Sequence, residues 1–492
     1  MITPDLPSFN RLSKRGNLTA VVRTVPADLE TPVSAFLKIA AGSRNAFFLE
    51  SAEQQEKIGR YSVIGLDPRR IFISEKGAVK EIRGSHSIKL GPAREILAVL
   101  QKTMAGYKIS NPESIPGFTG GLVGYLAYEN VEFFEDVRLK RDKKGPDFPD
   151  AVFFLSDQFL IFDHFQKTLS VVVLVDTGKK NAGGLYRAAV KTIEGQVKKL
   201  RRPMPPLKKS GRGAKLSPKP NMTRAAFETK VRRIKEYIRA GDCIQVVLSQ
   251  RFTLPAPKTD DFAIYRALRI VNPSPNMFYF RAGRFRLIGS SPEVLVTKTG
   301  REATVRPIAG TRPRGATPAE DLAHEENMKK SPKEMAEHLM LVDLARNDLG
   351  RVSEFDSIRV KHYARVERYS HVMHLVSDVT GKLKSGMNSF DLLKATFPAG
   401  TVSGAPKIRA MQIIDELEPE KRGAYAGCLG YFGFNGDMNM CITIRTLVMD
   451  GRKAYLQAGA GIVKDSGPAR EYQETVNKAG AVLKAFSMQG DF

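Results

Sequence analysis

A stretch in the middle of the chain decides the fold: residues 243–254 read CIQVVLSQRFTL. Its β-branched residues alternate with polar ones, as on a strand with one buried face. Further β-rich segments precede it at residues 151–155, 159–162 and 169–175. Helical and strand-like segments mix along the chain without the regular βαβ repeat of a parallel sheet. The pattern predicts an α+β protein with a largely antiparallel sheet.

A helix is predicted just before this strand, at residues 224–240, and a basic segment precedes the helix. Residues 200–222 read LRRPMPPLKKSGRGAKLSPKPNM, with several prolines and cations and no acidic residue. Such a composition is typical of a solvated linker or a long surface loop. We therefore divide the chain into an N-terminal region at 1–200, a linker at 201–221 and a C-terminal domain at 222–492.

The composition excludes several classes of protein. The 492 residues are 42% hydrophobic and 26% charged, which is the balance of a water-soluble globular chain. No apolar run reaches the roughly 18–20 residues that a membrane helix needs. The first twenty residues also lack the apolar stretch of a secretory signal. These features predict a cytoplasmic protein without a membrane partner.

The formal net charge of +25 is the largest deviation in the composition. Taken alone, it favours nucleic acid, anionic lipid or an anionic substrate as the ligand. The cations are spread along the chain and no helix-turn-helix, zinc-finger or RRM motif accompanies them, so we expect no nucleic-acid partner. Cys243, Cys428 and Cys441 form no CxxC pair, and we expect three buried thiols.

Two segments that begin like helices each carry a pair of glutamates. SPKEMAE (331–337) has the hydroxyl cap, the proline and the carboxylate of a helix start, and SGPAREYQE (466–474) repeats the design. Residues three apart leave the same face of a helix. The four carboxylates, which suit a hard divalent cation, are those of Glu334, Glu337, Glu471 and Glu474. Spacing leaves two alternatives open, namely helix capping by Glu334 and a surface ion pair between Glu474 and Lys478.

Several motifs resemble those of the chorismate-utilising enzymes, a family that includes anthranilate, aminodeoxychorismate, isochorismate and salicylate synthases. In chain order the motifs are FFLESAEQQEKIGRYSVIG (47–65), GFTGGLVGYLAYE (117–129), GDCIQVVLSQRF (241–252), NPSPNMFYF (272–280), GSSPEVLV (289–296), RPIAGTRPRG (306–315), KEMAEHLMLVDLARNDLGRV (333–352), FPAGTVSGAPK (397–407) and LQAGAGIVKDSGPAREYQET (456–475). The resemblance implies large, mostly antiparallel sheets with helices packed outside, in an intertwined two-part body. It also makes residues 222–492 the chorismate-binding catalytic domain.

Two positions favour one branch of this family. Members that add water to chorismate have a lysine base at the position of Gln245, and glutamine cannot take up a proton. Aminodeoxychorismate synthases have a lysine implicated in covalent catalysis at the position of Ala309, and a methyl group cannot be a nucleophile. The resemblance therefore implies a lyase that converts chorismate and ammonia to anthranilate and pyruvate through aminodeoxyisochorismate, the first step of tryptophan biosynthesis. The absence of tryptophan from the sequence fits this role.

The resemblance also implies catalytic roles. Glu337 and Glu474 would bind Mg²⁺ directly, Glu334 and Glu471 would act through bound waters, and the ion would hold the ring carboxylate of chorismate. Glu293 matches the general acid that protonates the departing hydroxyl group, a task that needs a raised pKa. The catalytic set that we expect is Glu293, His374, Gln245 and Thr311.

His374 and Arg445 each allow a structural interpretation. Strand alternation in HVMHLVSDV (371–379) fits a core histidine, whereas the resemblance assigns His374 to pyruvate loss and aromatisation. Arg445 lies in the strand-like run CITIRTLV (441–448), where an unpaired charge is costly. It matches an arginine that binds the enolpyruvyl carboxylate, assisted by a tyrosine that we place at Tyr425. The further contacts expected are Gly459, Ala460, Gly461, Thr401 and Lys478, with close backbone approach at the two glycines.

Feedback inhibition by tryptophan is implied by the motifs at 47–65 and 272–280, which resemble the two parts of the family's inhibitor pocket. The expected pocket residues are Glu50, Ser51, Asn272, Pro273, Ser274 and Met277. The sequence departs from the family at Asn276, where a tyrosine is usual. A ligand bound between N-terminal and C-terminal segments can bias two arrangements of the domains.

No glutamine amidotransferase, with its cysteine and histidine, is recognisable in the sequence. We expect a separate glutamine amidotransferase subunit as the source of ammonia, and hence a hetero-oligomer. Aminodeoxychorismate synthase is the nearest alternative function. A non-catalytic, basic binding protein on the same fold is the alternative of a different class.

Overall fold

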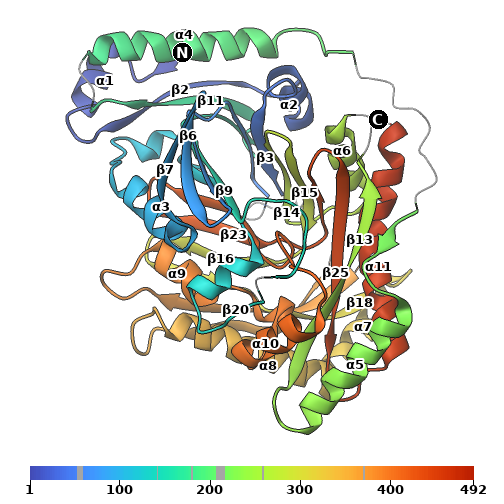
Figure 1. Cartoon of the computed structure of the whole chain (residues 1–492). Coiled ribbons are helices and arrows are strands. Elements are labelled where there is room, and N and C mark those ends of the chain that lie inside the picture. The colour runs from blue at the N-terminus through green and yellow to red at the C-terminus, as the bar shows by residue number, and fades with distance from the viewer. Residues whose placement is uncertain are drawn as a thin grey trace.

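The computed structural model describes residues 1–51, 59–140, 142–178, 181–206, 217–256, 260–368 and 372–491. Within them, two large sheets form the body of the molecule and the helices lie outside the sheets (Figure 1). The strand pairs that form both sheets are antiparallel. The predicted α+β class is confirmed.

The first sheet has 13 strands, in the order β1-β2-β11-β10-β4-β3-β14-β15-β24-β25-β13-β12, and β21 also pairs with β13. Its strands are β1 (Ile2–Thr3), β2 (Leu18–Pro26), β3 (Asn45–Glu50), β4 (Tyr61–Leu66), β10 (Gln158–Asp163), β11 (Thr168–Asp176), β12 (Lys219–Pro220), β13 (Gln245–Pro255), β14 (Asn276–Ala282), β15 (Phe285–Ser291), β21 (Gly404–Ala405), β24 (Thr446–Met449) and β25 (Lys453–Ile462).

The second sheet has 12 strands, in the order β18-β20-β17-β16-β23-β22-β8-β9-β5-β6-β7, and β19 also pairs with β20. Its strands are β5 (Arg70–Glu75), β6 (Ala78–Arg83), β7 (His86–Pro92), β8 (Gly121–Leu126), β9 (Ala151–Ser156), β16 (Val294–Thr299), β17 (Glu302–Val305), β18 (Ile308–Pro313), β19 (Arg359–Arg368), β20 (Val372–Lys382), β22 (Cys428–Gly433) and β23 (Met438–Ile442).

Helices surround the two sheets. The α-helices are α1 (Leu6–Leu12), α2 (Pro32–Ile39), α3 (Ile96–Ala105), α4 (Ala182–Leu200), α5 (Arg224–Arg239), α6 (Asp261–Val271), α7 (Pro318–Lys330), α8 (Pro332–Gly350), α9 (Ser389–Thr396), α10 (Lys407–Leu417) and α11 (Pro468–Ser487). The short 3-10 helices are η1 (Ala93–Glu95), η2 (Pro112–Ser114), η3 (Tyr128–Phe133), η4 (Gly400–Val402) and η5 (Met488–Asp491). Within the ranges given above, no helix is both long and apolar enough to cross a lipid bilayer.

Both sheets combine strands from the two sides of the basic segment. In the first sheet β3 pairs with β14, and in the second sheet β8 pairs with β22. Neither side completes a sheet by itself, which is the intertwined arrangement that was predicted. The division of the chain at residues 201–221 remains a prediction. Residues 207–216 of that segment lie outside the described residues, and its end forms the edge strand β12 beside β13.

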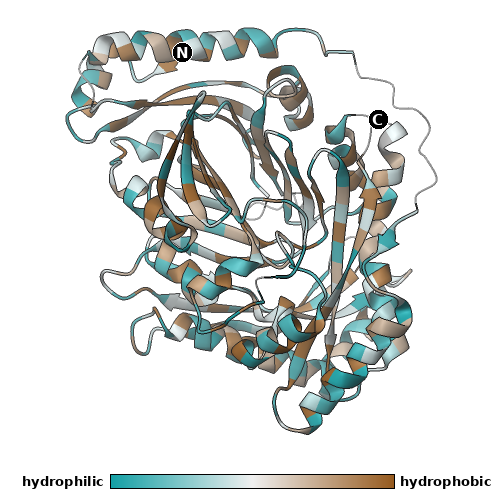
Figure 2. Cartoon of the chain, viewed as in Figure 1, coloured by the Kyte–Doolittle hydropathy of each residue, from teal (hydrophilic) through white to brown (hydrophobic). Residues whose placement is uncertain are grey.

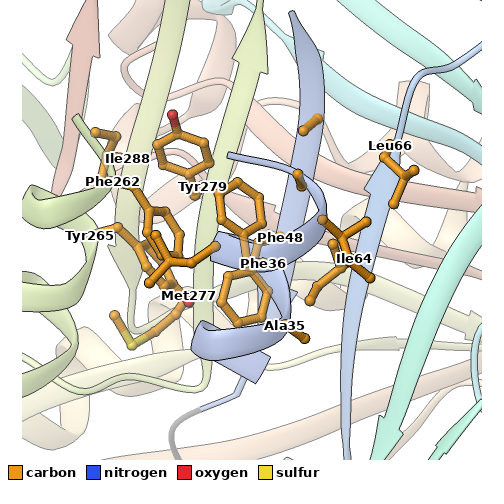
Figure 3. Packing of buried hydrophobic residues seen from close by; sticks show 14 of the residues in the cluster. Ala35, Phe36, Phe48, Ile64, Leu66, Phe262, Tyr265, Met277, Tyr279 and Ile288 are labelled. Atoms are coloured by element: carbon orange, nitrogen blue, oxygen red, sulfur yellow. The ribbon is translucent and has the colours of Figure 1, made fainter. Parts of the chain in front are cut away.

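The three largest clusters of buried hydrophobic residues form three layers. One layer lies between the first sheet and helices α2, α4, α6 and α11, and Figure 3 shows aromatic rings of this layer, including Phe36, Phe262 and Tyr279. A second layer lies between the two sheets. A third lies between the second sheet and helices α3, α8 and α9. In Figure 2 the inner strands are largely hydrophobic and the peripheral helices carry many hydrophilic residues.

The two glutamate-bearing helices form where they were predicted, but their capping differs. At α8 the Ser331 side chain accepts from the Glu334 backbone N–H, whereas the Glu334 carboxylate accepts from Arg312 at 3.0 Å instead of closing a capping box. At α11 the cap is Gly467, because the Ser466 hydroxyl accepts from the Val463 N–H at 3.1 Å. The prediction of Ser466 as a hydroxyl cap was therefore wrong.

Candidate active site

A cleft of about 720 Å³ lies between α8, α11, β18 and the adjoining ends of β13 and β25. Residues predicted from the sequence for catalysis, substrate binding and metal binding line it together. They are Gln245, Glu293, Thr311, Glu334, Glu337, His374, Thr401, Tyr425, Arg445, Gly459, Gly461, Glu471, Glu474 and Lys478. Ala460 is different, because alternation along β25 turns its methyl group into the core beneath α5, where it is fully buried.

The four glutamates come from the two helices that face this cleft. Burial, together with the neighbouring charges of Glu334 and Glu474, raises the pKa of Glu337. Burial and Glu474 also raise the pKa of Glu471. Glu334 is paired with Arg312 at 3.0 Å, and Glu474 with Lys478 at 2.7 Å. The ion pair between Glu474 and Lys478, left open by spacing alone, is therefore present.

This donor set fits a hard divalent cation in its chemistry. All four groups supply oxygen, and like charges gathered in a partly buried site are stabilised by a cation. In the ranges that the structure describes, however, no three acidic, histidine or cysteine side chains are grouped closely enough to hold a metal ion. To bind a metal ion, Glu334 would have to release Arg312, and Glu474 would have to release Lys478. Metal binding would therefore be coupled to movement of these two cationic side chains.

Glu293 follows the end of β15 and lies in the wall of the cleft. Burial raises the pKa of its carboxyl group to about 7, although Thr401, Lys478 and Arg445 act in the opposite direction. A substantial fraction of this group is therefore protonated at neutral pH, so that it can donate a proton.

His374 lies on β20, beside β18. Its Nδ1 is 2.9 Å from the Gly310 carbonyl oxygen and 3.1 Å from the Thr311 hydroxyl. A carbonyl oxygen only accepts hydrogen bonds, so the Nδ1–H donates and Nε2 keeps its lone pair. Burial lowers the pKa of the ring, and the arginine at position 445 adds to this effect. His374 is thus held as a neutral base with a fixed tautomer.

Arg445 lies between β23 and β24, with a positive φ of 50°. Burial lowers the pKa of its guanidinium, which Tyr425, Glu474 and Glu293 partly offset. Among the described residues, no carboxylate oxygen lies within 4.0 Å of the guanidinium nitrogens of Arg445. A cation in a strained backbone position, without a bonded anion, indicates a binding site for an anionic ligand.

Side chains closely cover two glycines of β25. A Cβ added at Gly459 would lie 2.7 Å from the Tyr425 hydroxyl, and one at Gly461 would lie 2.7 Å from Gln245 Nε2. The Gln245 amide also donates to Glu337 at 3.4 Å, and its Oε1 is buried without a hydrogen-bond partner among the described residues. Lys478 donates to the Gly459 carbonyl at 3.0 Å. The cleft therefore has a cationic side near Arg445 and an acidic side near Glu337.

A family model described as chorismate binding enzyme matches residues 44–484. The chain belongs to this family. Anthranilate synthase component 1 of Pseudomonas putida is 44% identical over 469 residues, which cover 94% of each chain. The protein of the same name from Acetivibrio thermocellus is 42% identical over 504 residues and covers 100% of both.

A solved structure agrees with these sequence matches. Anthranilate synthase component I from Streptococcus pneumoniae TIGR4 superposes with a TM-score of 0.77 at 36% identity, over 93% of this chain and 98% of that one. The resemblance seen in the motifs and the predicted fold of large, mostly antiparallel sheets with helices outside are both confirmed.

This chorismate binding enzyme has a second cleft, of about 710 Å³, that borders part of the predicted inhibitor set. Glu50, Ser51 and Met277 line it, whereas Asn272 lines the catalytic cleft and Pro273 lines neither. The Glu50 carboxylate accepts from Tyr265 at 2.6 Å and from Arg269 at 2.7 Å, and Figure 3 shows Met277 beside Tyr265 and Phe262. Residues 52–58 of the feedback motif lie outside the described residues.

Ser274, which also belongs to the predicted inhibitor set, lines neither cleft. It is buried, and its hydroxyl donates to the Ser291 carbonyl, two residues before Glu293. Pro292 and Ile308 line both clefts. Two segments therefore border both clefts, and one of them, at Pro292, leads directly into Glu293.

Some residues that line the two clefts were not predicted from the sequence. Lys333, Arg470 and Asn477 line the catalytic cleft, and Arg60 and Tyr61 line the second. Arg470 and Asn477 stand one turn before and one turn after Glu474, so the helical period could have identified them. Arg60 and Tyr61 stand inside the motif at 47–65, which could have identified them, but the pairing of Arg60 with Asp163 at 2.7 Å could not be read from sequence spacing.

Replacing Arg445 by methionine is expected to raise KM for chorismate by roughly 10–100-fold, since a charge-assisted contact is worth about 1.5–3 kcal/mol. Methionine fills a similar volume without burying a charge, so the melting temperature should stay the same or rise. Steady-state kinetics and thermal unfolding measure the two effects. An unchanged KM would remove Arg445 from the binding site.

Proposed function

We propose that this chorismate binding enzyme is the chorismate-converting component of an anthranilate synthase. In this role it is a lyase that forms anthranilate and pyruvate from chorismate and ammonia. The observation that carries the proposal is that one cleft is lined by a buried acid with a pKa of about 7, a neutral histidine and an arginine that has no bonded carboxylate among the described residues. The names of the relatives support the same activity.

Binding orients the substrate between the two sides of the cleft. Arg445, with the Tyr425 hydroxyl, binds the enolpyruvyl carboxylate, and Lys478 adds positive charge on this side. The ring carboxylate points toward the glutamates of α8 and α11. Glu337 and Glu474, with Glu334 and Glu471, would hold Mg²⁺, which supplies charge neutralisation for that carboxylate.

The first step replaces the ring hydroxyl by an amino group. Glu293 donates its proton to the departing hydroxyl, the carbon–oxygen bond breaks and water leaves. Ammonia forms the new carbon–nitrogen bond, and the extra proton of the resulting ammonium passes to the Glu293 carboxylate. The product is aminodeoxyisochorismate, and the enzyme returns to its starting protonation state.

The second step removes the side chain. His374 takes the ring proton on Nε2, the bond between the ring and the enolpyruvyl oxygen breaks, and the ring becomes aromatic. The released enolpyruvate takes this proton from the His374 imidazolium on its methylene carbon and becomes pyruvate, and His374 returns to its neutral form. Thr311, beside Nδ1, and the Gly310 carbonyl keep the imidazole in the orientation for this transfer.

The choice of ammonia as nucleophile rests on two residues of the cleft. Gln245 has no group that deprotonates water, and its unpartnered Oε1 can accept an N–H of ammonia. Ala309 also lines the cleft and has no nucleophilic atom. Both features disfavour the hydroxylating and the aminodeoxychorismate-forming branches.

We further propose that a separate glutamine amidotransferase component supplies the ammonia, and that the complex works in the cytoplasm. The designation component 1 of the relatives supports a second component. Tryptophan would inhibit from the second cleft, through the segment with Pro292 that both clefts share. Added tryptophan should then reduce anthranilate formation without competing with ammonia.

A product assay tests the proposed function directly. The isolated chain, supplied with chorismate, Mg²⁺ and ammonium, should produce the fluorescence of anthranilate together with one equivalent of pyruvate. With glutamine instead of ammonium it should be inactive until the amidotransferase component is added. An amino product without pyruvate release would indicate an aminodeoxychorismate synthase, and no consumption of chorismate would contradict catalysis.

A further inference from the structure

A buried ion pair lies behind the wall of the catalytic cleft, outside the set of residues that line it. The side chains of Arg422 and Glu418 are 2% and 3% exposed, and they are joined at 2.7 Å and 2.9 Å. Removing one partner of such a pair is strongly destabilising, because the other charge stays buried without compensation. Neither residue has a role in the steps described above.

Arg422 contacts three parts of the cleft wall. Its guanidinium donates to the Val402 carbonyl at 2.6 Å and to the Val247 carbonyl at 2.8 Å. It also lies over the ring of Tyr425, 5.5 Å from the centroid. Val402 directly follows Thr401, and Val247 is two residues from Gln245 on β13. One side chain therefore fixes segments that carry three residues of the proposed site.

Glu418 extends the same connection to β25. Its Oε1 accepts from the Ser249 N–H at 2.8 Å and from the Ser249 hydroxyl at 2.7 Å. The Ser249 hydroxyl in turn accepts from Gln457 Nε2 at 2.8 Å, and Gln457 lines the cleft two residues before Gly459. The pair thus connects β13 with β25, and the Tyr425 hydroxyl lies against Gly459 of β25.

We propose that Arg422 is a positioning residue that orients Tyr425, and with it the carboxylate-binding side of the cleft. The planar guanidinium has enough donors to bind Glu418 and both carbonyls while its face contacts the ring. Lysine keeps the charge but cannot make these contacts together. Without them the Tyr425 hydroxyl, which closely covers Gly459, loses its fixed position beside Arg445.

Arg281 provides a matched control elsewhere in the core. It is also buried, donates to the carbonyls of Ala41 and Ser43, pairs with Asp261 and lies over the ring of Tyr279 at 5.2 Å. It does not line the catalytic cleft. Arg281→Lys should therefore lower the melting temperature to a similar degree and leave KM for chorismate unchanged.

A double-mutant cycle tests this role with chorismate as the ligand. Arg422→Lys and Tyr425→Phe are each expected to raise KM about tenfold with little change in kcat, and the double variant should be no worse than Tyr425→Phe alone. Additive effects, or an equal rise in KM for Arg281→Lys, would overturn the proposal. If Arg422→Lys does not fold, the apolar pair Arg422→Met with Glu418→Met replaces it in the same cycle.

The positioning role of Arg422 rests on the proposed function only because its test measures KM for chorismate. If the wild-type chain bound chorismate without converting it, the proposed function would fail, and the cycle would use the Kd for chorismate from calorimetry instead of KM. The same non-additivity would then support the positioning role, and additivity would contradict it.

Discussion

Replacing Glu293 by glutamine is expected to lower kcat for anthranilate formation by about 10²–10⁴-fold, the usual contribution of a general acid. Glutamine has nearly the same shape and can still hydrogen-bond, but it has no proton to give to the departing hydroxyl. KM for chorismate should change little, because in the proposed function the carboxylate is bound by Arg445 and Lys478 and not by Glu293. Stopped and continuous fluorescence assays with ammonium as the nitrogen source measure the effect.

The pH dependence distinguishes an acid from a merely structural carboxylate. Because burial raises the pKa of Glu293 to about 7, its acid form is lost as pH rises through that value, and the turnover of the wild type should fall on this side. The histidine must be neutral, and its lowered pKa keeps it so at neutral pH. Free ammonia has to be held constant across the series. A Glu293→Gln variant that kept the wild-type rate, or the same alkaline limb, would contradict the assignment.

Glu337→Gln is expected to reduce turnover by at least about 10³-fold, since charge neutralisation by a metal ion contributes several kcal/mol. The amide removes one anionic ligand from α8 and also relieves the repulsion among Glu334, Glu337 and Glu474. Stability should therefore be retained or increased while activity is lost. Kinetics across a wide range of magnesium concentration measure the effect.

Glu326→Gln is the control for this variant. Glu326 lies on α7, its side chain is 71% exposed, and it pairs with Lys330 at 3.2 Å on the surface. Its replacement should change neither turnover nor the magnesium dependence. Full activity of Glu337→Gln at ordinary magnesium concentration would show that α8 does not bind the metal.

Local patterns explain why much of the fold could be predicted from the sequence. Strand β13 follows from alternation, helix α5 from its period, and α8 from a serine cap that the structure bears out. The start of α11 was misread, because Ser466 bonds back to Val463 and a glycine takes the capping position. Two serines that each stand shortly before a proline at a helix start can thus have different hydrogen-bond partners.

The sequence predicted which residues belong to the candidate site, but not how they are arranged in space. The motifs brought Glu293, His374 and Arg445 into one hypothesis, and the structure places all three in one cleft. A raised pKa was expected for Glu293 from its role, but the rise to about 7 could not be inferred, because it depends on burial by segments distant in the chain. The pair Arg422–Glu418 was missed for the same reason. Its proposed role depends on hydrogen bonds to β13 and η4, and the residues next to it in the sequence do not indicate these bonds.

The central claim is that glutamates from α8 and α11 hold a magnesium ion that binds the ring carboxylate of chorismate. Calorimetric titration of magnesium into the wild-type chain, with and without chorismate, tests it most directly. The account predicts one bound ion per chain, tighter binding when chorismate is present, and loss of that binding in Glu337→Gln and Glu474→Gln. Magnesium binding that is unaffected by either substitution, or by chorismate, would contradict it.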